Sequence, residues 1–259
     1  MIDLHCHVLP GVDDGPGSLE ESVHLARVAA AEGTRVLAAT CHVSHRYPTT
    51  SAEMRHGVAR VNAALREEGV PVEVVTGAEV APEILPRLER GELERLTLGG
   101  GPYLLLEAPL SAVGGELEEA VRGLQADGYG IVLAHPERCP SFHREPDRIR
   151  ALVAAGVLCS LTASSFTGRF GRPVQALSRR LLADGLVHNV ASDAHDAELR
   201  PPALRSSLEA AGTRLPGLDG MIPWLTEAAP EAILAGRPLP PAPPAPRSGR
   251  RRRLLGWRR

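Results

Sequence analysis

The sequence predicts an α/β protein in which parallel strands alternate with helices. Seven short apolar runs occur along the chain, and each is followed by a segment with the apolar spacing of an amphipathic helix. The runs are continuous rather than alternating, which is typical of strands covered on both faces. Histidine and acidic side chains follow the ends of most runs. A chain of 259 residues with 43% hydrophobic content is long enough for one α/β barrel.

The first strand is expected in the opening segment, where Ile2, Leu4 and Val8 are apolar and Pro10-Gly11 makes a turn. Pro109 prevents the fourth strand from continuing past Glu107. The later strands are expected at residues 35–41, 72–76, 103–107, 130–134, 157–161 and 187–191.

The first helix is expected to start at Ser18, because Ser18-Leu-Glu-Glu21 is a capping-box pattern, and to stop at Gly33. Pro82 is tolerated in the first turn of a helix. The other helices are expected at residues 51–68, 82–90, 116–127, 146–155, 174–184, 199–211 and within 221–234.

Potential metal ligands gather at the predicted carboxyl ends of the strands, where α/β barrels place their sites. His5 and His7 stand two apart on a strand, so both imidazoles point to the same side. Any one such residue has an ordinary structural explanation, but a whole set at one rim does not share one. The set comprises His5, His7, His42, Glu79, Glu107, His135, Asp193 and His195, with Asp14 in the loop after the first strand.

These residues are too many for one ion, since a zinc site takes about four ligands. We therefore expect two or three divalent ions, and mixed nitrogen and oxygen ligands suit Mn, Fe or Zn better than Ca or Mg. Neighbouring ions can activate a water and hold a phosphoryl group. Arg138 and Arg200 follow two of the ligand clusters, where they would bind phosphate oxygens. The alternative for each arginine is a surface ion pair.

Composition excludes several classes of protein. A net charge of -2 argues against a general nucleic-acid binder. No run of about 18 apolar residues and no signal peptide is visible, so we expect a cytoplasmic protein. Cysteine-based phosphatases place an arginine six positions after the nucleophile, and no cysteine here has one. The four are Cys6, Cys41, Cys139 and Cys159.

The composition changes after Gly236, so we expect a domain at residues 1–236 and a disordered tail at residues 237–259. The tail is rich in proline and alanine and then carries an arginine run at 250–253. One interpretation is a weak contact with an anionic membrane surface or an acidic partner. A solvated tail without a specific function is the other.

Five motifs together resemble the PHP (polymerase and histidinol phosphatase) superfamily over roughly residues 1–210. They are His5-Cys-His7, Thr40-Cys-His42, Gly77-Ala-Glu79, His135-Pro-Glu-Arg138 and Ser192-Asp-Ala-His195. Within it, the opening segment from His5 to Gly15 looks like the manganese-dependent protein-tyrosine phosphatases of bacterial capsule and exopolysaccharide loci. The family usually has Thr-Pro-His-His where this chain has Thr40-Cys-His-Val43, a departure that affects the rim of the pocket.

This resemblance implies a distorted (β/α)7 barrel with three metal ions, Mn2+ being favoured and Fe or Zn the alternatives. It also implies that Arg138 and Arg200 bind phosphate and that Gly11 and Gly15 shape the loop that carries Asp14. The implied ligand sets are His5, His7, Glu79 and Asp193 for the first ion, Glu79, Glu107 and His135 for the second, and Asp14, His42 and His195 for the third.

The expected activity is direct hydrolysis of phosphotyrosine in a protein. The resemblance implies that this protein substrate is a bacterial tyrosine kinase. The general acid is unassigned. The alternative enzyme is a PHP phosphoesterase acting on a small molecule such as histidinol phosphate. A non-catalytic binding module is disfavoured because every expected ligand is present. An exopolysaccharide assembly factor acting through the tail is a further alternative.

Overall fold

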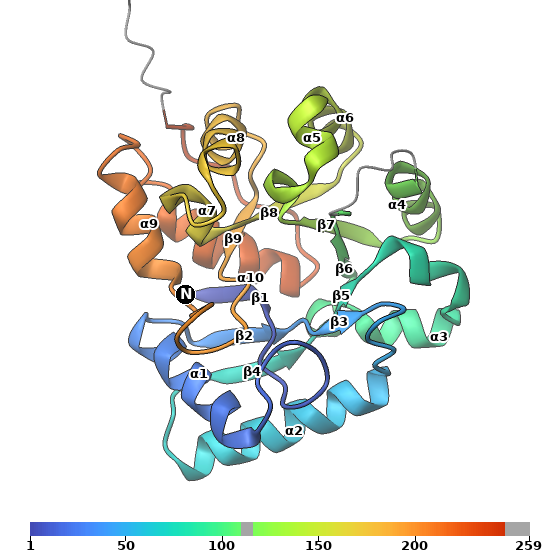
Figure 1. The fold of residues 1–259 in the computed structure, drawn as a ribbon. Helices are drawn as coiled ribbons and strands as arrows, with labels where there is room; N and C mark the ends of the chain where they lie inside the picture. Colours follow the sequence, from blue (N-terminus) through green and yellow to red (C-terminus); the bar gives the residue numbers. More distant parts are fainter. Residues whose placement is uncertain (110–115, 247–259) are drawn as a thin grey trace, which may run out of the picture.

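The strands form two parallel sheets. The structure, a computed structural model, describes residues 1–109 and 116–246 (Figure 1). The smaller sheet has the order β1-β2-β4, and the larger sheet has the order β3-β5-β6-β7-β8-β9. The strands are β1 (Ile2–Cys6), β2 (Val36–Ala39), β3 (His42–Val43), β4 (Glu73–Thr76), β5 (Glu79–Val80), β6 (Tyr103–Glu107), β7 (Gly130–Ala134), β8 (Leu158–Thr162) and β9 (Asn189–Ala191). The predicted α/β class with parallel strands is confirmed.

Two-residue breaks separate β2 from β3 and β4 from β5, and at these breaks the chain passes from the smaller sheet to the larger one. β2 pairs with β4, but after a short break the chain resumes as β3, which pairs with β5 through His42 and Glu79. Thr40 lies in the first break and Gly77 in the second. A Cβ on Gly77 would lie 3.2 Å from the methyl group of Thr40. A residue larger than glycine at position 77 would therefore push the two breaks apart. The sequence predicts that residues 35–41 form one strand that ends before His42. Instead His42 lies in a strand of its own.

The carboxyl end of β1 bridges the two sheets. On one side, the Thr40 N–H donates to the Cys6 carbonyl at 2.9 Å. On the other side, the His7 N–H donates to the Ala194 carbonyl at 2.8 Å, and the Asp193 N–H donates to the His5 carbonyl at 2.8 Å. The end of β1 is therefore held between β2 and the segment that follows β9.

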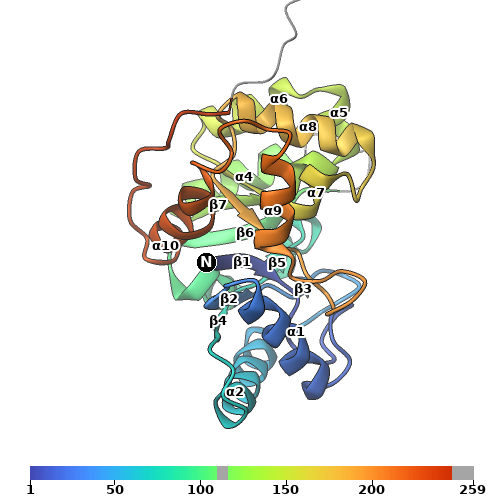
Figure 2. The ribbon, with the colours of Figure 1, turned by 90° about the vertical axis from the view of Figure 1, so that its left-hand side faces the viewer.

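Helices cover the outer sides of both sheets. Figure 1 shows α1 and α2 against the smaller sheet and α4 to α8 around the larger one, and Figure 2 shows α10 beside the amino end of β1. Their bounds are α1 (Leu19–Ala31), α2 (Ser51–Glu67), α3 (Arg90–Leu93), α4 (Glu116–Ala126), α5 (Pro140–Arg144), α6 (Asp147–Ala154), α7 (Ala163–Thr167), α8 (Arg172–Ala183), α9 (Leu204–Gly212) and α10 (Ala229–Leu234).

Several helices differ from expectation for local reasons. α9 begins at Leu204 rather than at residue 199, because Pro201 and Pro202 lack the N–H that a helix interior needs. Residues Pro82–Arg87 form 3₁₀ turns with Pro86 inside, and α3 follows separately. The predicted capping box is only half formed. The Ser18 hydroxyl accepts from the Glu21 N–H, but the Glu21 carboxylate accepts from the Gly17 N–H at 2.7 Å.

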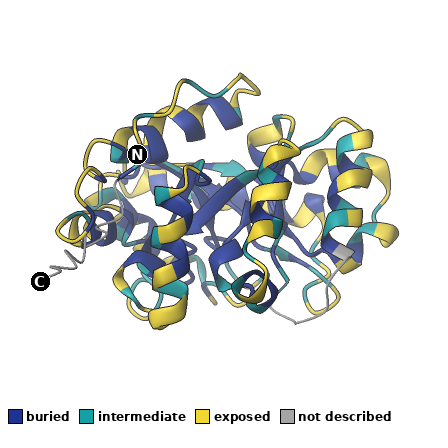
Figure 3. Cartoon of the chain, turned by 90° about the horizontal axis from the view of Figure 1, so that it is seen from above, coloured by how far each residue is buried: buried dark blue, intermediate teal, exposed yellow. Residues whose placement is uncertain are grey.

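The core is aliphatic, as the scarcity of aromatic residues (3%) requires. Figure 3 shows buried residues along the strands and the inward faces of the helices, with exposed residues on the outer faces. Phe142 and Phe166 are the two largest of the fully buried side chains among the described residues. Burying each Leu, Val or Ile contributes roughly 1.5–3 kcal/mol, so the packed helices hold the strand ends in fixed positions.

The packed part of the chain continues beyond the expected boundary at residue 236. Residues 237–246 carry no helix or strand, but Leu239 packs against the core and the Trp224 indole N–H donates to the Pro240 carbonyl at 3.0 Å. Pro246 is buried. The arginine run at 250–253 lies outside the described residues. Among the described residues, no helix is both long enough and apolar enough to cross a membrane.

Candidate metal centre

The structure brings all nine predicted ligands together where the two sheets meet. They fall into four overlapping groups, and within each group one possible ligand atom per residue lies within 4.8 Å of the others. The groups are His5, His7 and Asp193; His5, Glu79 and His135; His42, Glu79 and Glu107; and His7, Asp14, His42 and His195. These groups differ from the implied ligand sets mainly at Glu107, which lies with His42 rather than with His135.

Glu79 lies at the centre of this cluster. One carboxylate oxygen, Oε2, is 3.1 Å from His5 Nε2 and 3.2 Å from His42 Nδ1, and the other, Oε1, is 2.7 Å from His135 Nε2. Burial alone would raise the pKa of Glu79, but nearby His5 and His135 hold that pKa well below its usual range. A carboxylate that faces imidazoles through both oxygens has the geometry of a bridging ligand.

His5 of β1 and His7, just past the end of β1, point at each other rather than away. Their Nε2 atoms are 3.2 Å apart, and Asp193 Oδ1 lies 3.4 Å from the first and 3.6 Å from the second. All three side chains are buried. Imidazole nitrogens with free lone pairs and a carboxylate oxygen that converge in a buried space need a cation between them. The donor set therefore fits divalent metal ions with mixed nitrogen and oxygen ligands.

Asp14 closes the more open side of the cluster. Its Oδ1 is 3.3 Å from His195 Nε2 and 3.7 Å from His42 Nε2, and its side chain is 44% exposed. The close approach of His195 is the main reason that the pKa of Asp14 is lowered. This edge is the more accessible one, because His5 and Asp193, which belong only to the other groups, are nearly inaccessible.

Glu107 lies close to a second carboxylate, that of Glu79, in a largely buried position. Burial, and then repulsion from Glu79, raises the pKa of Glu107 to about 8. A positive ion near both carboxylates would remove that repulsion. The position of Glu107 at the end of β6 thus fits a ligand better than a structural carboxylate.

Asp13 is part of the site although it is not among the ligands predicted from the sequence. Its Oδ2 accepts from His7 Nδ1 at 2.6 Å and from the His42 N–H at 2.9 Å, while Oδ1 accepts from the Gly15 N–H at 3.0 Å. A carboxylate on the far nitrogen fixes the tautomer that presents Nε2 to a metal. The signal in the sequence is the acidic pair Asp13-Asp14, of which the resemblance implied only Asp14 as a ligand.

Glycines shape the loop that carries the acidic pair, as the resemblance implied. Gly11 has a φ of +72° and its N–H donates to the Pro16 carbonyl at 2.8 Å. A Cβ on Gly15 would lie 2.6 Å from the His7 carbonyl oxygen. Only glycine fits this close approach, which folds Asp13 and Asp14 back over β1.

Backbone strain is concentrated at two predicted ligands. His135 has a φ of 33° and Asp193 a φ of 53°, and no other non-glycine residue described has a positive φ. Such conformations cost on the order of 1–3 kcal/mol and recur at functional sites. Here the left-handed turn at each strand end directs the side chain into the cluster.

Arg138 and Arg200 both pair with the buried carboxylate of Asp193. Arg200 Nη2 is 2.9 Å from Asp193 Oδ2, and Arg138 binds the same oxygen. Asp193 therefore faces the histidines with Oδ1 and the arginines with Oδ2. Its pKa is lowered, because the neighbouring histidines and arginines outweigh the effect of burial. The two arginines are 17% and 29% exposed, and their ion-pair partner is a buried carboxylate rather than a surface one.

Glu137 was also missed. It is fully buried, and its Oε1 accepts from the Thr162 N–H at 2.9 Å and from the Ser165 hydroxyl at 2.7 Å. These bonds attach the turn between His135 and Arg138 to the start of α7. The sequence offered only an acidic residue beside a ligand, and its partners come from a distant segment.

The cysteines lie in the core. Cys6, Cys41, Cys139 and Cys159 are buried and form no disulfide. Burial raises the pKa of the Cys6 and Cys41 thiols well above the usual value. They pack as small apolar residues, and a raised pKa disfavours the thiolate that a nucleophile requires.

Comparison with known proteins places this geometry in a family. Residues 1–218 match the family described as capsular polysaccharide synthesis, CpsB/CapC. The chain is 34% identical to the tyrosine-protein phosphatase YwqE of Bacillus subtilis, over 99% of this chain and 100% of that protein. It is 30% identical to the putative tyrosine-protein phosphatase CapC of Staphylococcus aureus, over 79% and 81% of the two chains.

A solved structure agrees with both sequence matches. It comes from work on YwqE from Bacillus subtilis and CpsB from Streptococcus pneumoniae, described as unique metal-dependent tyrosine phosphatases. It superposes with a TM-score of 0.81 at 32% identity and covers 96% of this chain and 100% of that one. The chain therefore belongs to the CpsB/CapC family of capsular polysaccharide synthesis.

Proposed function

We propose that this protein is a metal-dependent phosphatase that removes the phosphate from phosphotyrosine in a protein and acts in capsule or exopolysaccharide synthesis. The observation that carries the proposal is the buried cluster of nine metal-ligating side chains beside two arginines, in a chain similar along 99% of its length to a tyrosine-protein phosphatase. The substrate that we propose is a bacterial tyrosine kinase, and the proposed location is the cytoplasm.

Three divalent ions, Mn2+ first and Fe or Zn as alternatives, are the cofactors that we propose. When bound, they supply an activated water and positive charge for the phosphoryl oxygens. The residues that would hold them are His5, His7, Asp14, His42, Glu79, Glu107, His135, Asp193 and His195.

The arginines bind and orient the substrate. Each guanidinium carries further N–H donors beyond those used on Asp193, and a phosphate can accept two of them side by side. Asp193 holds both arginines at the edge of the cluster, so the phosphate that they bind lies next to the ligands. Tyrosine, with a pKa of about 10, is a better leaving group than serine and demands less of a general acid.

We also propose that the two sheets work as one distorted seven-unit barrel. β3 follows β2 and β5 follows β4 after two-residue breaks, which leaves seven strand positions. The bridge between Cys6 and Ala194 links the first position to the last. Closure would bring every strand end to one rim, which is what the ligand cluster needs.

The test combines metal content with activity on a phosphotyrosine peptide. Two to three ions per chain by mass spectrometry, with activity lost to a chelator and restored by Mn2+, are expected. Glu79→Gln removes the bridging charge at nearly constant volume and should abolish both. The matched control is Glu73→Gln, an exposed position at the other end of the same interrupted strand.

The other outcomes are equally informative. Bound metal without phosphotyrosine hydrolysis, but with turnover of a small phosphomonoester such as histidinol phosphate, would replace the proposed substrate. Purified protein that holds no metal, and that Mn2+ does not activate, would overturn the proposal.

A further inference from the structure

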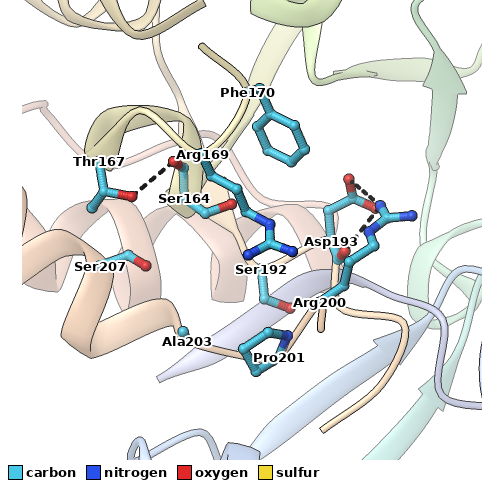
Figure 4. Close-up of a pocket in the computed structure, with 10 residues that line it drawn as sticks. All are labelled: Ser164, Thr167, Arg169, Phe170, Ser192, Asp193, Arg200, Pro201, Ala203 and Ser207. Atoms are coloured by element: carbon cyan, nitrogen blue, oxygen red, sulfur yellow. Dashed lines mark hydrogen bonds and ion pairs between the residues drawn. The ribbon is translucent and has the colours of Figure 1, made fainter. Parts of the chain in front are cut away.

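A small cavity lies directly beside the arginine pair. It has a volume of about 160 Å³ and shares Asp193 and Arg200 with the site described above. Its other walls come from α7, from the segment just after α7 and from the amino half of α9 with the residues before it (Figure 4). Figure 4 shows the Arg169 guanidinium directed into the space between α7 and Ser192.

The walls of this cavity carry an excess of positive charge. Arg169 and Arg200 both line it, and the one acidic lining residue is Asp193. That carboxylate is already paired with Arg200 and with Arg138 behind it. An anion entering the cavity therefore meets guanidinium groups without a free carboxylate to repel it.

Several hydrogen-bond donors in the cavity are uncommitted. Arg169 uses one terminal nitrogen on the Leu199 carbonyl, and its remaining N–H groups have no partner in the described part of the chain. The hydroxyls of Ser164 and Ser207 likewise have none there. Ser207 lines the cavity and is only 8% exposed. Unused donors around a positive space are what a tetrahedral oxyanion requires.

We propose that this cavity is a second oxyanion site, which holds a phosphate group next to the metal centre but apart from it. The volume corresponds to roughly five waters at ~30 Å³ each, which is enough for a phosphate. Two sources share this chemistry: the inorganic phosphate released by the reaction, and a second phosphorylated side chain on the same peptide. Phosphate binding in this cavity goes beyond the proposed function. Any effect of that binding on phosphatase turnover rests on the proposed function.

Arg200 connects the two sites. Its Nη2 contacts both the carboxylate and the carbonyl oxygen of Asp193, at 2.9 and 3.3 Å. An oxyanion in the cavity competes with Asp193 for the same guanidinium. Occupancy of the cavity should thus change how tightly Arg200 holds a phosphate at the metal centre.

The direct test is calorimetric titration of the metal-loaded protein with inorganic phosphate. We expect two binding events in the wild type. Arg169→Gln should weaken one event by about tenfold or more and leave the other, since a hydrogen bond to a charged group is worth that much. Ser164→Ala with Ser207→Ala should weaken the same event less. Arg172→Gln removes an equal charge from an exposed position outside the cavity and should change neither.

Peptides identify the source of the oxyanion. If it is a second phosphorylated side chain, the wild type should have a lower KM for a doubly phosphorylated peptide than for a singly phosphorylated one, and Arg169→Gln should lose that preference. Two phosphate-binding events without such a preference would assign the cavity to released phosphate. A single binding event, unchanged in Arg169→Gln, would overturn the second site. Loss of the proposed activity with both events retained would refute the phosphatase and leave the cavity standing.

Discussion

Replacing Asp13 by asparagine should weaken metal binding without removing a ligand. The carboxylate accepts three hydrogen bonds, two through Oδ2 and one through Oδ1, and its side chain is inaccessible. An asparagine has one acceptor oxygen. If that oxygen faces His7, the new NH2 group meets the Gly15 N–H. If the amide turns around, the NH2 group meets His7 Nδ1, which must then shed its proton to Nε2, the nitrogen that should bind metal.

Either orientation carries a cost that can be estimated. One buried N–H without an acceptor costs about 1–3 kcal/mol, and loss of a carboxylate behind a metal-binding histidine typically lowers metal affinity ~10–100-fold. We therefore expect the free Mn2+ concentration for half-maximal activity to rise by about one to two orders of magnitude. At saturating Mn2+ the activity should largely recover, because the ligands themselves remain.

The assay is peptide hydrolysis in metal buffers that span the free Mn2+ range, with thermal unfolding of the chelated protein alongside. Glu53→Gln is the matched control. It also removes a carboxylate that accepts a backbone N–H, from Thr50 at 2.8 Å, but at an exposed position. A folded Asp13→Asn protein whose Mn2+ requirement stayed within twofold of the wild type would refute the role assigned to Asp13.

Three further predictions concern residues around and away from the site. The ring of Phe170 lies under the Arg138 guanidinium at 4.4 Å, so Phe170→Leu should lower kcat/KM by roughly 2- to 30-fold while Phe170→Tyr retains it; equal losses would exclude the aromatic contact as the cause. Glu137→Ala should lower the free energy of unfolding in urea by about 1–3 kcal/mol, because a buried N–H loses its acceptor, whereas Glu137→Gln should stay near the wild type. Burial lowers the pKa of His188 to about 4, and its neutral Nδ1 accepts the Cys159 N–H at 3.0 Å. The folded-state pKa of His188 lies below the ordinary value of 6.5, so the neutral imidazole contributes fully to the free energy of unfolding above pH 6.5. As the pH falls from 6.5 toward 4, the free energy of unfolding decreases by at most about 3 kcal/mol. His188→Asn should remove this part of the pH dependence of the unfolding free energy, and an unchanged slope would contradict it.

The strands could be predicted where one apolar run forms one strand. β6 and β7 have the expected bounds, because each run ends at a residue that cannot continue it or leads directly into the turn. The prediction of one strand at residues 35–41 was wrong, because the apolar residues continue past Ala39, where β2 ends. That break depends on packing between Gly77 and Thr40, which are far apart in the sequence. The short helices α5 and α7 were missed because they are too brief to show periodicity.

The ligands could be predicted, but the residues that orient them could not. A ligand such as His135 or Asp193 stands at a strand end, and parallel strands bring such ends together whatever the details of packing. Asp13 and Glu137 act through hydrogen bonds to particular backbone N–H groups of other segments. Nothing in their local sequence differs from an ordinary acidic residue in a turn. Their roles follow only from the three-dimensional contacts.

The interruptions in the strands explain why so many ligands can converge. A regular strand presents alternate side chains to one side, so its end supplies one or two ligands. By ending β2 and β4 early and resuming as β3 and β5, the chain places His42 and Glu79 opposite each other in register. Glu79 then reaches His5 in one sheet and His135 in the other. The carboxylate we assign as the bridging ligand is thus at the junction of the sheets, and filling that junction with a larger residue at Gly77 should separate the ligands before it unfolds the protein.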